Sequence, residues 1–333
     1  MTQIDGGLRA PSVSAVLLLD GIGETDPKRM LGPVHAWIAA AGDKLSEPEA
    51  FVDERGARNI VAQGRTMFLH AREVPEIVSH DLLRGALANP LLGVFFPTAE
   101  AVADGHSAHV VLTVGPGEYG DDDEPAEPAA LGPDTMLPLL RVLKKFCGGY
   151  VQNKFPLAAL WTQSGVFRGG ADFAQFALQH ADGPNSEVEL FVDVIPYEVV
   201  DGEGRSWFGA VTNGATAVIG REVEVAPAQV ALDWVLDRVL QYVASVMDAP
   251  NVKREAFRMA QDEALIVSDA PADDRFPLGR TVLTVEQAPA SAMPAPATPA
   301  APPVAVAAPP LDAHAAILPA GDPSRRSAFG RRA

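Results

Sequence analysis

The sequence predicts an α+β protein with a mainly antiparallel sheet and a long C-terminal tail. Patterns typical of strands and helices alternate irregularly, unlike the regular alternation of a doubly wound parallel sheet. Two strand patterns flank the turn-rich residues 201–204, which indicates a β-hairpin and therefore antiparallel pairing. Two βαβ-like halves are compatible with the order of these patterns.

The first elements follow from apolar runs and helix boundary signals. Residues 13–19 are apolar and rich in β-branched side chains, which is typical of a buried strand. A helix is expected to begin near Pro27 and to stop at Gly42, because proline suits a first turn and glycine ends helices. The other elements expected here are one or two strands within 59–69, a helix over 74–88, and a strand or buried connector at 91–96.

The middle of the chain contains the clearest strand pattern. Within residues 109–114, Val110, Leu112 and Val114 face one side of a sheet and the residues between them face the other. An acidic, proline-rich surface loop is expected up to residue 133, because the charge block at 121–124 cannot be buried. A helix over 135–147 should then end at the glycines 148 and 149.

The second half is expected to contain the hairpin and the longest helix. The hairpin strands are predicted at 188–200 and 205–211. Residues 228–247 carry a wide apolar stripe at helical spacing. The other elements expected here are strands at 157–162, 222–225, 265–267 and 280–285, and a helix over 172–179.

We divide the chain into an N-terminal α+β half over 12–152, a C-terminal α+β half over 153–287, and a tail over 288–333. A chain of 333 residues allows about two domains. From Ala288 the composition changes to alanine and proline, which offer little apolar area to bury. We therefore expect the tail to be a disordered linker that ends in a basic motif.

The net charge of −17 restricts the classes of partner. An acidic body repels phosphate backbones and anionic lipids, which argues against nucleic acids and membranes as its partners. No basic segment followed by an apolar run stands near the N-terminus, and the apolar run at 15–19 is too short to span a membrane. The single Cys147 allows no intramolecular disulfide. We therefore expect a cytoplasmic protein.

The residue types in the sequence do not predict a metal or a cofactor. His106 and His109 are three residues apart, so on one strand they project to opposite faces and cannot chelate one ion unless His106 lies in the preceding loop. We expect His109 to be a half-buried sheet residue that hydrogen-bonds a neighbour. The acidic residues 121–124 lack the spaced oxygen ligands of a calcium loop.

Residues 161–172 contain the best cluster of polar and aromatic side chains in the chain. The favoured role of Asp172 is the N-cap of the following helix. The sequence contains no nucleophile–base pair or carboxylate dyad at a spacing typical of an active site. This argues against an enzyme, and we assign no catalytic residue. Our candidates for a ligand cleft are His109, Trp161, Ser164, Arg168 and Asp172.

The end of the tail combines an aromatic residue with two arginine pairs. Such an array on a long spacer suits docking onto an acidic surface, and a purely solubilising end is the alternative. The candidate partner-binding residues are Arg325, Arg326, Phe329, Arg331 and Arg332.

Three blocks carry a resemblance to a known family. They are His-Ser-Ala-His-Val-Val-Leu-Thr-Val at 106–114, Leu-Trp-Thr-Gln-Ser-Gly-Val-Phe at 160–167, and residues 212–225 before a long helix. In their order they resemble bacterial proteins that carry domain of unknown function 4261, over much of residues 13–286. The chain departs from the family pattern at 213–215 and at Arg221. The resemblance implies a fold and a bacterial source, and it names no catalytic residue.

The leading functional hypothesis is a cytoplasmic binding or adaptor protein. Its acidic body would recognise a protein partner, with an immunity-type role toward a basic toxin as one version, and the tail would add a tethered contact. The alternative is an enzyme or small-ligand-binding protein that uses a cleft near residues 161–172 together with His109.

Overall fold

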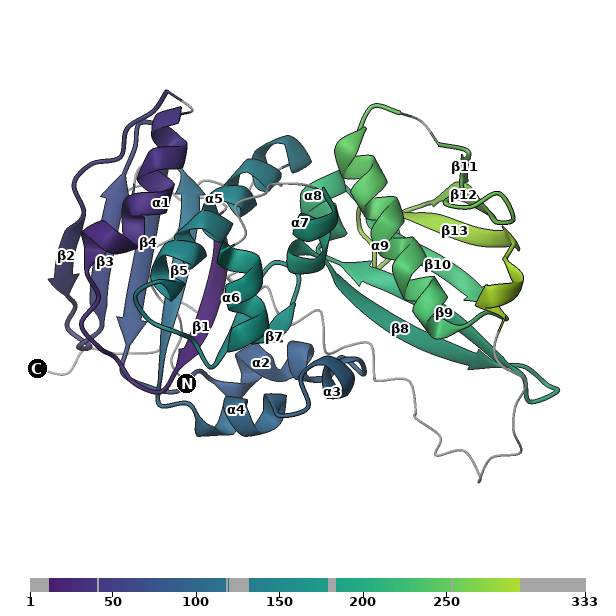
Figure 1. Ribbon diagram of the computed structural model, residues 1–333, viewed down its shortest axis with the longest axis horizontal. Helices are drawn as coiled ribbons and strands as arrows, with labels where there is room; N and C mark the ends of the chain where they lie inside the picture. Colours follow the sequence, from purple (N-terminus) through teal and green to yellow (C-terminus); the bar gives the residue numbers. More distant parts are fainter. Residues whose placement is uncertain are drawn as a thin grey trace, which may run out of the picture.

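The computed structural model describes residues 12–40, 42–117, 119, 132–178, 184–252 and 254–293. Within these residues the protein folds as two mostly antiparallel sheets with helices packed against them (Figure 1). The predicted α+β class is therefore confirmed. The predicted tail motif and the acidic residues 121–124 lie outside the described residues.

The first sheet has seven strands, and every neighbouring pair in it is antiparallel. Its hydrogen-bonded order is β2-β3-β4-β5-β1-β6-β7. The strands are β1 (Val13–Leu19), β2 (Glu49–Val52), β3 (Arg58–Gln63), β4 (Met67–Val74), β5 (Ala108–Pro116), β6 (Ala158–Trp161) and β7 (Phe167–Gly169).

Both faces of this sheet are covered, because alternate residues of β1 enter two separate cores. Ala15 and Leu17 belong to the larger core, whereas Val16 and Leu18 belong to the smaller one. Helices α1 (Pro27–Ala40) and α5 (Pro133–Val151) pack together over the larger core. The smaller core is closed by α2 (His80–Leu87) and α4 (Ala99–Gly105), with the short α3 (Leu92–Phe95) between them in sequence.

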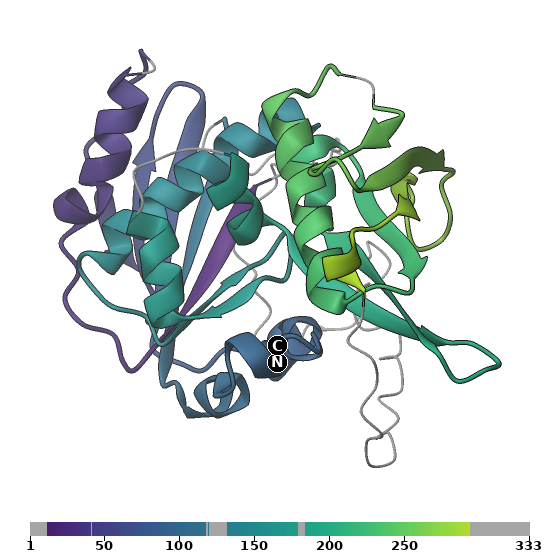
Figure 2. The same cartoon turned by 45° about the vertical axis from the view of Figure 1, so that its right-hand side comes forward.

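The second sheet has the order β11-β12-β13-β10-β9-β8, and its only parallel pair among the described strands is β10 with β13. The long helix α9 packs on β8, β9 and β10 (Figure 2). The strands are β8 (Asp193–Val200), β9 (Ser206–Asn213), β10 (Glu222–Ala228), β11 (Ala256–Phe257), β12 (Ala264–Ala270) and β13 (Arg280–Gln287). The remaining helices are α6 (Gly170–Leu178), α7 (Pro184–Phe191), α8 (Ala215–Ile219), α9 (Leu232–Asp248) and the 3₁₀ turn η1 (Ala290–Ala292).

The larger core is continuous between the two sheets. It includes Val13 and Leu112 of the first sheet and Val225 and Leu283 of the second. The predicted boundary at 152/153 stands before β6 and β7, which both belong to the first sheet, so the chain passes between sheets after Gly169. The predicted tail boundary at 288 is also early, because Ala292 is buried and its carbonyl accepts the N–H of Ala231 at 2.7 Å.

Several predicted elements differ from the structure for identifiable reasons. The helix predicted from Val74 begins only at His80, because Val74 completes β4 and Ser79 caps the helix. Residues 92–95 form a short helix instead of a strand or connector. The first four residues of the predicted strand 188–200 belong to α7, because an apolar run of that length fits either structure.

Glycines 148 and 149 lie inside α5 and do not end it. A Cβ on Gly148 would come within 2.6 Å of the Ala177 carbonyl oxygen of α6, and one on Gly149 would overlap the Met30 carbonyl oxygen of α1. The pair therefore allows α5 to approach two helix backbones at once, and tertiary packing overrides the stop signal. Within the described residues, no helix combines the length and apolar character needed to cross a membrane.

Gly149→Ala should destabilise the protein by about 2 kcal/mol or more, because the added methyl group forces α1 and α5 apart. Gly32→Ala is the matched control. Gly32 is an exposed position of α1 where an added methyl group would meet no atom within 4 Å, so alanine should stabilise by about 0.5–1 kcal/mol. Urea unfolding monitored by circular dichroism measures both changes. Equal effects of the two substitutions would contradict the close-packing role of Gly149.

Candidate functional site

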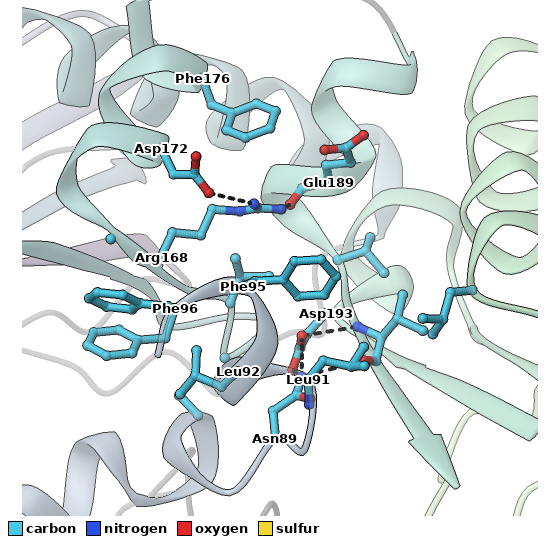
Figure 3. A pocket seen from close by; sticks show the side chains of 18 of the residues that line it. Asn89, Leu91, Leu92, Phe95, Phe96, Arg168, Asp172, Phe176, Glu189 and Asp193 are labelled. Atoms are coloured by element: carbon cyan, nitrogen blue, oxygen red, sulfur yellow. Dashed lines mark hydrogen bonds and ion pairs between the residues drawn. The ribbon is translucent and has the colours of Figure 1, made fainter. Parts of the chain in front are cut away.

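A cavity of about 490 Å³ lies where parts of both sheets meet the short helix α3. Its walls come from the β7–α6 segment, from the α7–β8 segment and from α9 (Figure 3). Most of the lining side chains are apolar. They include Phe95, Phe96, Phe176, Val194, Leu236 and Leu240.

The position of α3 is fixed by an aromatic contact with β7. The rings of Phe96 and Phe167 have centroids 5.6 Å apart. Gly169 faces the same ring, and a Cβ there would lie 3.2 Å from the Cε2 atom of Phe96. The small residue therefore leaves room for Phe96. Its neighbour Phe95 exposes 67% of its surface and stands at the edge of the cavity.

Arg168 forms one polar part of the wall. Its Nη2 donates to the Glu189 carbonyl oxygen at 2.7 Å, and its Nη1 lies 3.7 Å from Asp172 Oδ2. The guanidinium stacks 4.7 Å from the centroid of the Phe176 ring. Its Nε is buried and finds no hydrogen-bond partner among the described residues. Burial lowers the pKa of Arg168, and the neighbouring carboxylates partly offset this effect.

Asp193, the first residue of β8, forms the other polar part. The amide Nδ2 of Asn89 lies 2.8 and 2.9 Å from its two carboxylate oxygens, and the Val194 N–H donates to Oδ1 at 3.1 Å. No cation of the described residues stands within ion-pair distance. Burial raises the pKa of Asp193 to about 7, although these hydrogen bonds and Arg168 act in the opposite direction.

Asn89 links two wall segments of the cavity that are far apart in the sequence. Its Oδ1 accepts the N–H of Leu91 at 2.9 Å, at the start of the turn into α3. Its Nδ2 donates to Asp193, which is 104 residues away in sequence. One side chain therefore joins the α2–α3 connection to the second sheet.

The structure brings together two of the five predicted cleft residues. Arg168 and Asp172 line the cavity. Asp172 lies in the first turn of α6, which begins at Gly170, so it pairs with Arg168 and is not the predicted N-cap. Ser164 is buried just beside the lining residue Gly165, and its carbonyl oxygen accepts the amide Nδ2 of Asn213 at 2.6 Å.

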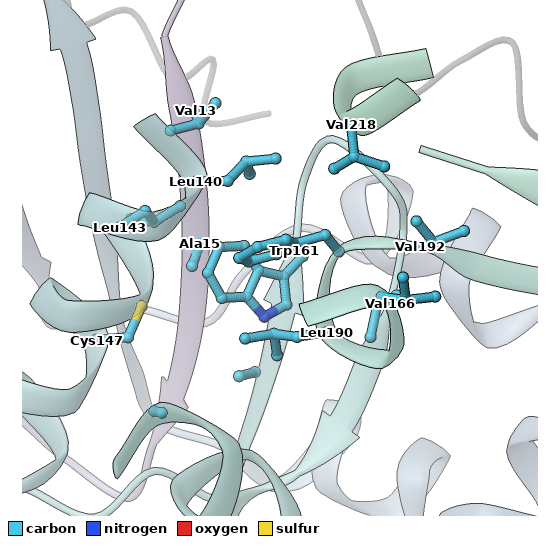
Figure 4. Packing of buried hydrophobic residues seen from close by; sticks show 14 of the residues in the cluster. Val13, Ala15, Leu140, Leu143, Cys147, Trp161, Val166, Leu190, Val192 and Val218 are labelled. Atoms are coloured by element: carbon cyan, nitrogen blue, oxygen red, sulfur yellow. The ribbon is translucent and has the colours of Figure 1, made fainter. Parts of the chain in front are cut away.

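Trp161 lies in the larger core and does not line the cavity (Figure 4). Its ring centroid is 5.3 Å from that of Phe191 and 6.3 Å from that of Phe173. It packs among residues of β1, α5 and the α7–β8 segment, including Ala15, Leu143 and Val192. Its role in the described structure is therefore packing between layers.

His109 also lies away from the cavity. It is half-buried, and its Nδ1 hydrogen-bonds the Glu76 carbonyl oxygen at 2.7 Å, as expected of a sheet residue that bonds a neighbour. His106 is buried, and its Nε2 accepts the Val78 N–H at 2.7 Å while Nδ1 lies 2.8 Å from the Ala103 carbonyl oxygen. Burial lowers the pKa of both rings. Among the described residues, no cluster of three or more metal-ligating side chains is found.

Sequence reasoning missed Asn89, Asp193 and the aromatic walls. One signal was present for Asp193, because it is a lone carboxylate within the apolar run 190–195. A charge in such a run is buried unless the run is exposed, and buried charges need an explanation. Asn89, Phe95 and Phe96 carried no comparable signal.

No family model, curated protein or solved structure matches the chain. The resemblance to domain of unknown function 4261 therefore stays a prediction from the three sequence blocks.

Asp193→Asn should change how stability depends on pH. The folded pKa of about 7 lies above the ordinary value of 3.8, so the folded state retains a proton that the unfolded state loses between these values. This group's contribution to the unfolding free energy therefore falls as pH rises from about 4 to 7, by at most about 1.4 kcal/mol per pH unit. The variant lacks this fall, so its stability relative to the native protein should rise from pH 5 to pH 8.

Urea unfolding at pH 5, 6, 7 and 8 measures this difference. Asp262→Asn, at an exposed position outside the cavity, is the control and should follow the native curve. Parallel curves for Asp193→Asn and the native protein would contradict the burial of an ionisable Asp193.

Proposed function

We propose that this protein binds a small, largely apolar molecule in the cavity between the two sheets. The observation that carries the proposal is the combination of a volume near 490 Å³ with aromatic walls and only a few polar groups. Small-ligand sites in proteins have this composition and fall within this range of size.

The cavity is too large to be a packing defect. Protein interiors are packed as densely as organic crystals, and voids larger than a water molecule are few. This space is also bounded by segments far apart in sequence, which contribute Asn89, Arg168 and Leu240 to its walls. The hydrogen bond between Asn89 and Asp193 holds two of these segments together.

The chemistry of the lining supports binding more than nucleophilic catalysis. Among the described lining residues there is no serine, threonine, cysteine, histidine, lysine or tyrosine. His109, which the enzyme hypothesis placed with Arg168 and Asp172, bonds Glu76 elsewhere in the fold. The polar groups present suit orientation of a ligand by hydrogen bonds and charge.

A protein partner is our second proposal, and the net charge of −17 favours it. Electrostatic attraction would act on a basic partner within the Debye length, which is about 8–10 Å at physiological ionic strength. The tail residues Arg325, Arg326, Phe329, Arg331 and Arg332 would provide the tethered contact. A cytoplasmic location, and a body that binds neither nucleic acid nor membrane, stay predictions from the sequence.

Filling the cavity should weaken ligand binding. We expect 2-phenylethanol, a neutral probe of nine heavy atoms, to bind with a Kd on the order of 1 mM, and Leu240→Trp to weaken it at least about tenfold. Leu278→Trp is the matched control, because Leu278 is exposed and outside the cavity. Saturation-transfer NMR titration measures the Kd. Unchanged binding to Leu240→Trp, or no binding to the native protein, overturns the proposal.

The partner proposal has its own test. A pull-down compares the full chain with a chain ending at Met293, which keeps the contact between Ala292 and Ala231. A partner held by both chains at about 50 mM salt and released at about 0.5 M salt supports recognition by the acidic body. A partner held only by the full chain assigns recognition to the tail. No specific partner with either chain rejects the proposal.

A further inference from the structure

The half-buried Asp193 carboxylate at the cavity wall has no charged side chain within ion-pair distance among the described residues. Its donors are the Asn89 amide and one backbone N–H, and both are neutral. An ionised carboxylate offers about four lone-pair positions, so acceptor capacity remains toward the cavity. A charge that is partly withdrawn from water is less stable when it has no charged partner. The site therefore favours a ligand group that brings both charge and N–H donors.

Arg168 does not provide that charge by direct contact. Its guanidinium is directed to the Glu189 carbonyl oxygen and to Asp172, and it stacks on Phe176. In Figure 3 it lies beside these residues, whereas Asp193 lies beside Asn89 and Leu91 on the other wall. Arg168 and Asp193 are therefore held on different walls of the cavity, and each contacts a different set of residues.

The charge balance of the lining also selects the sign of the ligand. Three carboxylate residues, Asp172, Glu189 and Asp193, stand against a single arginine. An anionic ligand would be repelled by this excess of negative charge. A cation is attracted by the same excess.

Aromatic rings in the cavity wall add to this selection. Phe95 and Phe96 line the cavity, and a ligand cation within about 6 Å of an aromatic centroid gains cation–π attraction. Leu236 and Leu240 of α9 offer an apolar wall for the rest of the molecule. These surfaces suit a compact ligand with one charged end.

We infer that the ligand carries a protonated amine on a compact apolar body, and that the Asp193 carboxylate is the ion-pair partner of the amine. This inference rests on the proposed function of the cavity as a ligand site. The ammonium group supplies up to three N–H donors, which fill the free acceptor positions of Asp193. The apolar body lies between Phe95 and Phe96 on one side and the leucines of α9 on the other.

Binding of the amine should depend on pH through Asp193. The charged residues that line the cavity with it are Arg168 on β7, Asp172 on α6 and Glu189 on α7, and no histidine is among the described lining residues. With a pKa of about 7, most of Asp193 is protonated at pH 6 and ionised at pH 8. The amine should therefore bind about tenfold more tightly at pH 8 than at pH 6.

The test compares three probes of similar size in calorimetric titrations at pH 8. They are 2-phenylethylamine, 2-phenylethanol and 3-phenylpropionate, which are cationic, neutral and anionic. We expect the amine to bind the native protein at least about tenfold more tightly than the alcohol. Asp193→Asn should abolish this preference and leave the affinity for the alcohol unchanged, while Asp262→Asn should preserve both.

The outcomes separate the two proposals. Equal affinity for amine and alcohol, or tighter binding of the anion, overturns the inference and leaves the cavity as a ligand site. Binding of none of the three probes rejects the proposed function itself. A preference for the amine that survives in Asp193→Asn assigns the amine to another carboxylate and overturns the role of Asp193.

Discussion

Burial of Trp161 between the layers is the packing constraint on which the rest of the body depends. The indole lies on β6 of the first sheet and meets Phe191, which leads into the second sheet. Because this large side chain is almost completely buried, the first sheet, α5 and the α7–β8 segment must all close around it. The continuous core between the sheets follows from this arrangement.

The same residue positions the cavity through the chain that follows it. The Trp161 N–H donates to the Val166 carbonyl oxygen at 2.9 Å, and the Gly165 N–H donates to the Trp161 carbonyl oxygen at 2.8 Å. Gly165 adopts a φ of 75°, a conformation that glycine takes without strain. This tight turn reverses the chain into β7 and delivers Arg168 to the wall. A core residue and a cavity residue are thus coupled through one short turn.

Elements with a strong local periodicity could be predicted from the sequence. Prediction failed where contacts between distant parts of the chain determine the local structure. The alternation in β1 and β5 was predictable, because successive side chains of a strand point to opposite faces. The hairpin of β8 with β9 was predictable from the turn-rich residues between its strands. The glycines of α5 were misread, since their purpose is the approach of α1 and α6.

The candidate site shows the same limit. Arg168 and Asp172 are four residues apart on neighbouring elements, so their proximity was visible in the sequence. The pairing of Asn89 with Asp193 was not visible, because no local pattern relates residues on different layers. His109 and Trp161 were assigned to a cleft from residue type alone, and the faces on which they lie place them elsewhere.

The parallel pairing of β10 with β13 has a consequence for synthesis of the chain. Among the described strands β13 is the last in sequence, yet it lies between β10 and β12 in the second sheet. Until it emerges from the ribosome, β12 has no hydrogen-bonded link to β8, β9 and β10. The strands of the first sheet all precede β13 in the chain, so they are synthesised before the second sheet can close.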